Sequence, residues 1–244
     1  MNFNKIEKSG FRSWPALEES ENNGIVLRFS NGYTKRANSA NVIKQQKNNF
    51  EFLVDQYEKY FKAKNLPCIF RLPSFSNNKK LDNYLEDRGY KSIGRSLILC
   101  RSLVNSDFND TNITEKNRIE WMLSYCRINE INIDKQTTHL EMLKRIKDKV
   151  LMVVLKVDEV EVACGLGVIS DDYFGLFDIA TKKSARNKGY ATKLLDGMLR
   201  WAVENGASFS YLQVVAENQA AIKLYKKFGY QHGYEYCYRI NQKD

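Results

Sequence analysis

Apolar residues along the chain recur at two periods, and these periods predict alternating strands and helices. The clearest case is the stretch from Asp178 to Val203. Residues 177–181 suit a strand, the polar and flexible segment 186–189 suits a turn, and from Ala191 apolar side chains fall on one helical face. That face comprises Leu194, Leu195, Met198, Leu199, Ala202 and Val203. The stretch therefore predicts strand, tight turn and helix.

The predicted turn ends at a helix N-terminus, where backbone N–H groups lack partners and the helix dipole is positive. A phosphate is the anion best stabilised at such a position. Gly189 has no side chain to block close approach, and Arg186 and Lys188 add positive charge. The turn is thus a candidate phosphate-binding site.

The pattern in the rest of the chain predicts further elements. In the first half, Ile25–Phe29 is expected to be a strand, Asn31-Gly32 a hairpin turn and residues 33–38 the returning strand. Residues 1–24 are expected to be irregular, with residues 11–17 packing across the fold. The other expected helices are 46–63, 78–88, 114–129 and 135–147, and the other expected strands are 67–72, 91–103, 150–157, 160–169, 173–181 and 211–215. The segment 104–114, rich in Asn, Asp, Ser and Thr, is the expected linker.

Two motifs in the C-terminal half resemble those of the GNAT acetyltransferases. Residues Arg186 to Ala191 match (Gln/Arg)-x-x-Gly-x-(Gly/Ala), and Asn218, Tyr225 and Gly229-Tyr230 match the second signature, Asn-x-x-Ala-x-x-Leu-Tyr followed by an aromatic or Leu, Gly and an aromatic. Both occur in the family's order over about residues 115–241. The resemblance implies an α/β fold, with an α+β mixed sheet flanked by helices.

The resemblance also implies acetyl transfer from acetyl-CoA to an amine by direct attack in a ternary complex. Main-chain groups of Ile179, Ala180 and Thr181 would pair with the pantetheine arm, and the two helices at 114–147 would line the acceptor side. Tyr225 matches the family's tyrosine acid, and Asn218 its cofactor-contacting asparagine. The residues expected to hold the pyrophosphate are Arg186, Asn187, Lys188, Gly189, Tyr190, Ala191 and Thr192.

Each of these residues also has a simpler structural interpretation. Tyr225 could be a packed helix aromatic, Asn218 an N-cap, and Arg186 and Lys188 surface charges. The general base is open as well, since Asp178, Glu217 and Asp172 are candidates by location alone. Strand alternation would put Asp178 opposite Ile179, either in the acceptor cleft or facing solvent. We take Asp178 as the candidate base.

An internal repeat relates the two halves at a spacing of 140 positions, as between Gly89 and Gly229. We expect a degenerate GNAT-like domain at 1–110 and the acetyltransferase domain at 111–244. In the first copy Asn49 stands at the position of Gly189, and Leu85 at that of Tyr225. The first half is therefore expected not to bind acetyl-CoA, and either to shape the acceptor cleft or to replace a dimer partner.

Composition narrows the class of protein. The net charge is +9, but the charges are spread out, so we expect a solvated surface and not a nucleic-acid partner. No run of about 18 apolar residues and no signal peptide occur, so a cytoplasmic protein without a membrane span is expected. With five scattered cysteines and two histidines, free thiols and no metal are expected.

The sequence leaves three functions open. The first is acetylation of a primary amine, expected on a small molecule, by a monomer or homodimer. The second is a non-catalytic acyl-CoA sensor, against which Tyr225 and the intact turn argue. The third is acetylation of a protein N-terminus or lysine. No pattern in residues 114–150 specifies the acceptor.

Overall fold

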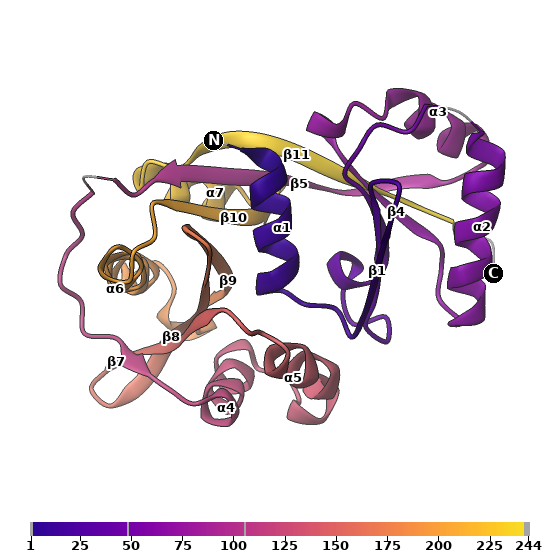
Figure 1. The fold of residues 1–244 in the computed structure, drawn as a ribbon. Helices are drawn as coiled ribbons and strands as arrows, with labels where there is room; N and C mark the ends of the chain where they lie inside the picture. Colours follow the sequence, from indigo (N-terminus) through magenta and orange to yellow (C-terminus); the bar gives the residue numbers. More distant parts are fainter. Residues whose placement is uncertain (1, 48, 105, 242–244) are drawn as a thin grey trace.

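The computed structural model describes residues 2–47, 49–104 and 106–241. They form one mixed sheet of eleven strands flanked by helices (Figure 1), which confirms the predicted fold class. In spatial order the strands are β1 (Glu18–Asn22), β2 (Ile25–Phe29), β3 (Ser39–Val42), β4 (Ile69–Pro73), β11 (Gln231–Ile240), β5 (Lys91–Ser102), β10 (Phe209–Val215), β9 (Tyr173–Thr181), β8 (Val160–Ser170), β7 (Lys149–Val157) and β6 (Thr114–Glu115).

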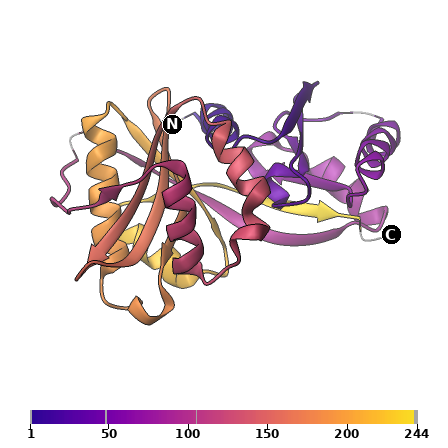
Figure 2. The same ribbon diagram turned by 90° about the horizontal axis from the view of Figure 1, so that it is seen from below.

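The helices cover both faces of this sheet. They are α1 (Phe3–Ser13), α2 (Phe50–Ala63), α3 (Lys79–Asp87), α4 (Arg118–Asn129), α5 (Thr137–Lys144), α6 (Tyr190–Glu204) and α7 (Gln219–Lys227), with short 3-10 turns η1 (Lys35–Ala37), η2 (Ser74–Ser76), η3 (Ile133–Gln136) and η4 (Lys183–Ala185). Apolar residues of α1, α4 and α5 pack on one face of the C-terminal strands, and those of α6 and α7 on the other. Helices α2 and α3 share a third core with β2 to β4. Figure 2 shows α4 and α5 side by side on their face.

The two halves repeat one another at the predicted spacing. Helix α2 begins at Phe50 and α6 at Tyr190, and strand β5 begins at Lys91 and β11 at Gln231. The last strand of each half pairs with the other half, because β11 lies between β4 and β5, and β5 lies between β11 and β10. These two long strands run side by side across the middle of the molecule (Figures 1 and 2). A continuous sheet therefore joins both copies.

The centre of the repeat is visible in the pairing of β5 with β11. Ser96 and Tyr236 occupy equivalent positions of the two copies, and they are also partners in the register. Nearby, the equivalent residues Arg95 and Glu235 form an ion pair of 2.6 Å. An approximate two-fold axis through this point relates the halves.

The residues of the first copy that correspond to Asn218 and Tyr225 have structural contacts. Asn78, the counterpart of Asn218, accepts a hydrogen bond from the N–H of Gln46 at 2.7 Å and donates to the carbonyl of Lys44 at 3.2 Å. These bonds tie the start of α3 to the chain that follows β3. Leu85, at the position of Tyr225, is fully buried.

Several local predictions were wrong. Residues 3–13 form a helix where an irregular segment was predicted. The buried face of this helix consists largely of polar or small residues, so the sequence shows no apolar period there. Asn31-Gly32 does form the predicted turn, with positive φ at both residues and a hydrogen bond of 2.9 Å from the N–H of Tyr33 to the carbonyl of Ser30. A further hairpin turn at Asn23-Gly24, between β1 and β2, was not predicted. The strand that returns beside β2 is β3, whereas residues 33–38 contain η1. Helix α4 begins at Arg118, not Thr114, with Asn117 and Glu120 forming a capping box.

Candidate active site

The site begins at an irregularity in strand β9. Cys164 pairs with Ala180 and Leu166 with Phe177, so Asp178 and Ile179 together face only Gly165 of β8. Such a two-against-one arrangement is a β-bulge, and its first residue, Asp178, has a left-handed φ of 50°. The carbonyl of Gly165 accepts a hydrogen bond of 3.0 Å from the indole of the buried Trp121. Helix α4 thus supports the bulge through the side chain of Trp121.

The bulge coincides with the point where two parallel strands separate. β9 and β10 pair from Tyr173 to Leu176 and from Phe209 to Leu212, and their register ends there. Beyond it, Ala180 and Thr181 still pair with β8, but β10 does not pair with their other edge. Residues of β9 are buried up to Phe177 and half-buried from Asp178 on. An open strand edge therefore faces the gap, at the three residues predicted to meet the pantetheine arm.

A cleft of about 810 Å³ occupies this gap. It brings together four of the predicted site residues, namely Asp178, Ile179, Asn218 and Tyr225. The first half contributes Tyr33, Arg36 and Ile69 to its lining, and β11 contributes Tyr236 and Tyr238. Of the three candidate bases only Asp178 lines the cleft. Asp172 lies in the turn before β9, and Glu217 is exposed beside Asn218.

The predicted phosphate turn lies past the end of β9. Arg186, Asn187, Lys188 and Gly189 are exposed, and α6 begins at Tyr190 with no acidic residue in its first turn. Gly189 has φ 78°, and a Cβ there would meet no atom within 4 Å. The turn thus combines exposed positive charge with the unpaired N–H groups of a helix start.

Tyr225 and Asn218 are placed by helix α7. The Asn218 side chain accepts a hydrogen bond from the N–H of Ala221 at 3.1 Å, so Asn218 does cap the helix. Tyr225 packs against Tyr230 with the ring centroids 5.8 Å apart, and burial raises its pKa to about 12. Its ring is buried and lines the cleft. A phenol with such a pKa stays protonated near neutral pH and can donate a proton or a hydrogen bond.

Asp178 lies on the face opposite Ile179, as predicted, because Asp178 contacts His139 of α5 whereas Ile179 packs against the core under α6. The bulge also brings Asp178 to the same face as Phe177. The carboxylate of Asp178 lies 3.1 Å from Nε2 of His139 on α5, in contact but without the alignment of a hydrogen bond. His139 is fully buried and surrounded by aromatic rings. The centroids of Trp14, Tyr33 and Tyr125 lie 5.0, 5.3 and 5.4 Å from that of His139.

Burial and the Asp178 carboxylate together raise the pKa values of Tyr33 and Tyr125. Both phenols therefore stay neutral beside the carboxylate of Asp178. Sequence reasoning missed His139, Trp14, Tyr33 and Arg36 as parts of the site. They come from α5 and from the first half, and no local spacing connects them to Asp178.

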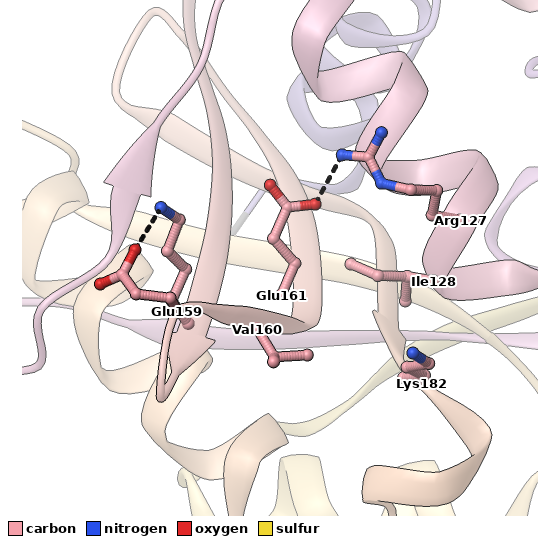
Figure 3. Close-up of a pocket in the computed structure, with 7 residues that line it drawn as sticks. Arg127, Ile128, Glu159, Val160, Glu161 and Lys182 are labelled. Carbon is pink, nitrogen blue, oxygen red and sulfur yellow. Dashed lines mark hydrogen bonds and ion pairs between the residues drawn. The ribbon is translucent and has the colours of Figure 1, made fainter.

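A second hollow, of about 370 Å³, lies between the end of α4 and the β7–β8 hairpin (Figure 3). Glu161 there pairs with Lys116 at 2.6 Å and Arg127 at 2.9 Å. Partial burial raises the pKa of Glu161, but these partners outweigh it and lower the pKa to about 2. Glu159 also pairs with Lys156 at 3.2 Å, so both carboxylates of this hollow have cationic partners, which is typical of a structural ion network.

Within the described ranges no group of three His, Cys, Asp or Glu side chains could hold a metal ion. All five cysteines are free thiols, as predicted. None of the helices in the described part of the chain is both long and apolar enough to cross a bilayer.

Comparison with known proteins decides the family. A family model described as "Probable histone acetyltransferase Rv0428c C-terminal" matches residues 2–239. The chain belongs to this family of GNAT acetyltransferases. A relative from Bacillus subtilis (strain 168), described as "Uncharacterized N-acetyltransferase YobR", is 29% identical over 248 residues, which cover 98% of each chain. The GNAT resemblance is confirmed, and the chain is an acyltransferase.

Solved structures show the same fold at low sequence identity. A GCN5-related N-acetyltransferase from Kribbella flavida superposes with a TM-score of 0.73 at 13% identity, covering 98% of this GNAT chain and 95% of the other. A tandem GNAT protein from the clavulanic acid biosynthesis pathway gives 0.62 at 8% identity, covering 78% and 68%. The tandem GNAT-like architecture predicted from the repeat is therefore confirmed.

Proposed function

We propose that this acetyltransferase moves the acetyl group of acetyl-CoA to a primary amine of a small molecule, by direct attack in a ternary complex. The observation that carries the proposal is the bulge at Asp178 and Ile179. The bulge lies where β9 and β10 cease to pair, between Tyr225 and the start of α6, whose N-terminus is suited to bind a phosphate. The proposed active domain is 111–244, with 1–110 as the degenerate copy that completes the cleft.

The cofactor is proposed to lie along the open edge of β9. Its pyrophosphate would meet the backbone N–H groups and charges of residues 186–192, where Gly189 leaves room for close approach. Its pantetheine arm would pair with main-chain groups of Ile179, Ala180 and Thr181, as an added strand does. Asn218 would contact the arm with the part of its amide not used in capping α7.

The proposed reaction needs one base and one acid. The amine nitrogen attacks the thioester carbonyl carbon, so that the C–N bond forms and the C–S bond breaks. Asp178 takes the proton that the attacking amine loses, with His139 holding the carboxylate in place. Tyr225 gives its proton to the departing thiolate. Its raised pKa keeps the phenol protonated until that step.

The test is release of CoA from acetyl-CoA with a panel of amines, amino acids, aminoglycosides, polyamines and short peptides. The thiol signal must be corrected for the five cysteines of the protein. We expect turnover with a small amine. Turnover with peptides alone would replace the acceptor by a protein N-terminus or lysine, and binding of acetyl-CoA without any turnover would contradict the proposed transfer.

A further inference from the structure

Arg36 places a cation in the cleft, which it lines together with Asn218 and Tyr225. It belongs to η1 in the first half of the chain. Its guanidinium carbon lies 5.6 Å from the ring centroid of Trp14 and 5.8 Å from that of Phe177. Among the described residues it forms no ion pair, and its buried Nε has no hydrogen-bond acceptor. The other buried or half-buried arginines near it are paired, as Arg71 is with Glu7 at 2.6 Å.

The backbone of Arg36 is fixed by a buried arginine. Its carbonyl accepts a hydrogen bond of 3.1 Å from the guanidinium of Arg28, which is fully buried and itself paired with Glu19 at 2.9 Å. The fold therefore fixes the backbone of Arg36, and the guanidinium is placed by its contacts with the rings of Trp14 and Phe177. Two aromatic faces offset only part of the cost of keeping a guanidinium half-buried without a counter-ion. A guanidinium in this state is well suited to bind a carboxylate, which it matches in a planar, two-bond geometry.

The cleft also carries the opposite charge close by. Asp178 directly follows Phe177, whose ring contacts Arg36, and both side chains lie on the same face of the bulged strand. A molecule with one ammonium and one carboxylate group would place its amine at Asp178 and its carboxylate at Arg36. The rings of Trp14 and Tyr33 would then border the rest of the molecule.

We infer that the acceptor is an amino acid, whose carboxylate is bound by Arg36 while its amine is acetylated. This inference rests on the proposed function and narrows its acceptor. It assigns the first half of the chain a direct part in substrate selection. It also excludes a lysine side chain within a protein as the acceptor, because such a lysine has no free carboxylate close to its amine.

The test compares amino acids with the amines left when their carboxylate is removed, such as leucine with 3-methylbutylamine and phenylalanine with phenethylamine. We expect kcat/KM to favour the amino acid by about 10- to 100-fold, the worth of hydrogen bonds to a charged group. Arg36→Gln should raise KM for the amino acid by a similar factor and remove the preference. KM for acetyl-CoA should change less than about twofold, because the cofactor binds elsewhere.

Lys59→Gln is the control, since it removes an exposed cation of the first half that does not belong to the cleft lining. We expect it to leave the preference intact. Equal turnover of both members of each pair, or an equal loss for both in Arg36→Gln, would overturn the inference.

Binding of N-acetyl-leucine and of N-(3-methylbutyl)acetamide, measured by calorimetry, separates the two proposals. Binding of N-acetyl-leucine that Arg36→Gln abolishes, in a protein that acetylates nothing, would leave the carboxylate site standing and contradict the transfer. Transfer to amines without carboxylates, with no binding of N-acetyl-leucine, would uphold the transfer and overturn the carboxylate site.

Discussion

The carboxylate of Asp178 and Nε2 of His139 lie 3.1 Å apart, although one belongs to the bulge of β9 and the other to helix α5. His139 is fully buried, whereas Asp178 reaches the cleft. A histidine that contacts a candidate base from behind can fix its orientation. The pair therefore connects the acceptor-side helices to the strand that opens the cofactor cleft.

Replacing Asp178 by Asn should lower kcat by about 10²- to 10⁴-fold, the usual contribution of a positioned general base. KM for acetyl-CoA should stay nearly constant, because the pantetheine would be bound by main-chain groups. His139→Gln should give a smaller loss, since it removes the support and not the base. Steady-state kinetics on the purified variants measures both effects. Asp172→Asn, in the turn before β9, is the control, and a comparable loss there would contradict the assignment of the base.

Replacing Gly189 by Asp should abolish binding of acetyl-CoA. The change puts bulk and negative charge where the pyrophosphate is expected, at a residue with φ 78°. Gly206→Asp is the matched control, because Gly206 has a similar φ of 86°, ends the same helix region and also leaves space for a Cβ. Both variants should suffer the ~1–2 kcal/mol cost of a left-handed residue. Calorimetric titration should show binding lost only in Gly189→Asp, and retained binding would refute our interpretation of the turn.

The buried pair of Glu7 and Arg71 should be important for stability. Arg71 donates two hydrogen bonds of 2.6 and 2.8 Å to Glu7, which also accepts one from Tyr234, so α1, β4 and β11 meet at this carboxylate. Glu7→Gln leaves a buried guanidinium without its counter-ion, and we expect the free energy of unfolding to fall by ~3–5 kcal/mol. Glu18→Gln, which breaks the exposed pair with Lys64, should cost under ~1 kcal/mol. Denaturant titrations of the two variants should therefore differ clearly, and equal losses would contradict this view of α1.

The rate should resist alkaline pH. Burial raises the pKa of Tyr225 to about 12, so its proton is lost only as pH rises through that value. A solvent-exposed tyrosine would lose its proton near pH ~10. We expect kcat to show no loss attributable to Tyr225 up to about pH 10, with circular dichroism confirming that the protein stays folded. A decline centred near the ordinary tyrosine value, in folded protein, would speak against a buried acid.

The sequence predicted the parts of the site that local patterns encode. The predicted strand 173–181 has the bounds of β9, and the helix after Gly189 follows from its apolar period. These elements carry their own signals, since an apolar face and a glycine turn lie within one short stretch. Gly89 and Gly229 likewise follow helices and have positive φ, as the repeat suggested.

The sequence could not predict features that depend on distant packing. Strand β1 is exposed at all five positions, so it shows no alternation that would identify Asn23-Gly24 as a hairpin turn. The bulge at Asp178 breaks the period of two without a sequence marker. Strands β5 and β11 each pair with the other half of the chain, and this pairing arises only when both halves fold together. The same holds for the approach of Arg36 and His139 to β9.

The most direct test of the account is the Tyr225→Phe variant, with kcat and the dissociation constant of acetyl-CoA measured on the same protein. The change removes one hydroxyl and keeps the buried ring, so the fold and the cofactor contacts should survive. We expect kcat to fall by about 10²-fold or more while acetyl-CoA affinity stays within about twofold. An unchanged kcat, or an equal loss of turnover and affinity, would contradict an acid role for Tyr225 in the cleft between β9 and β10.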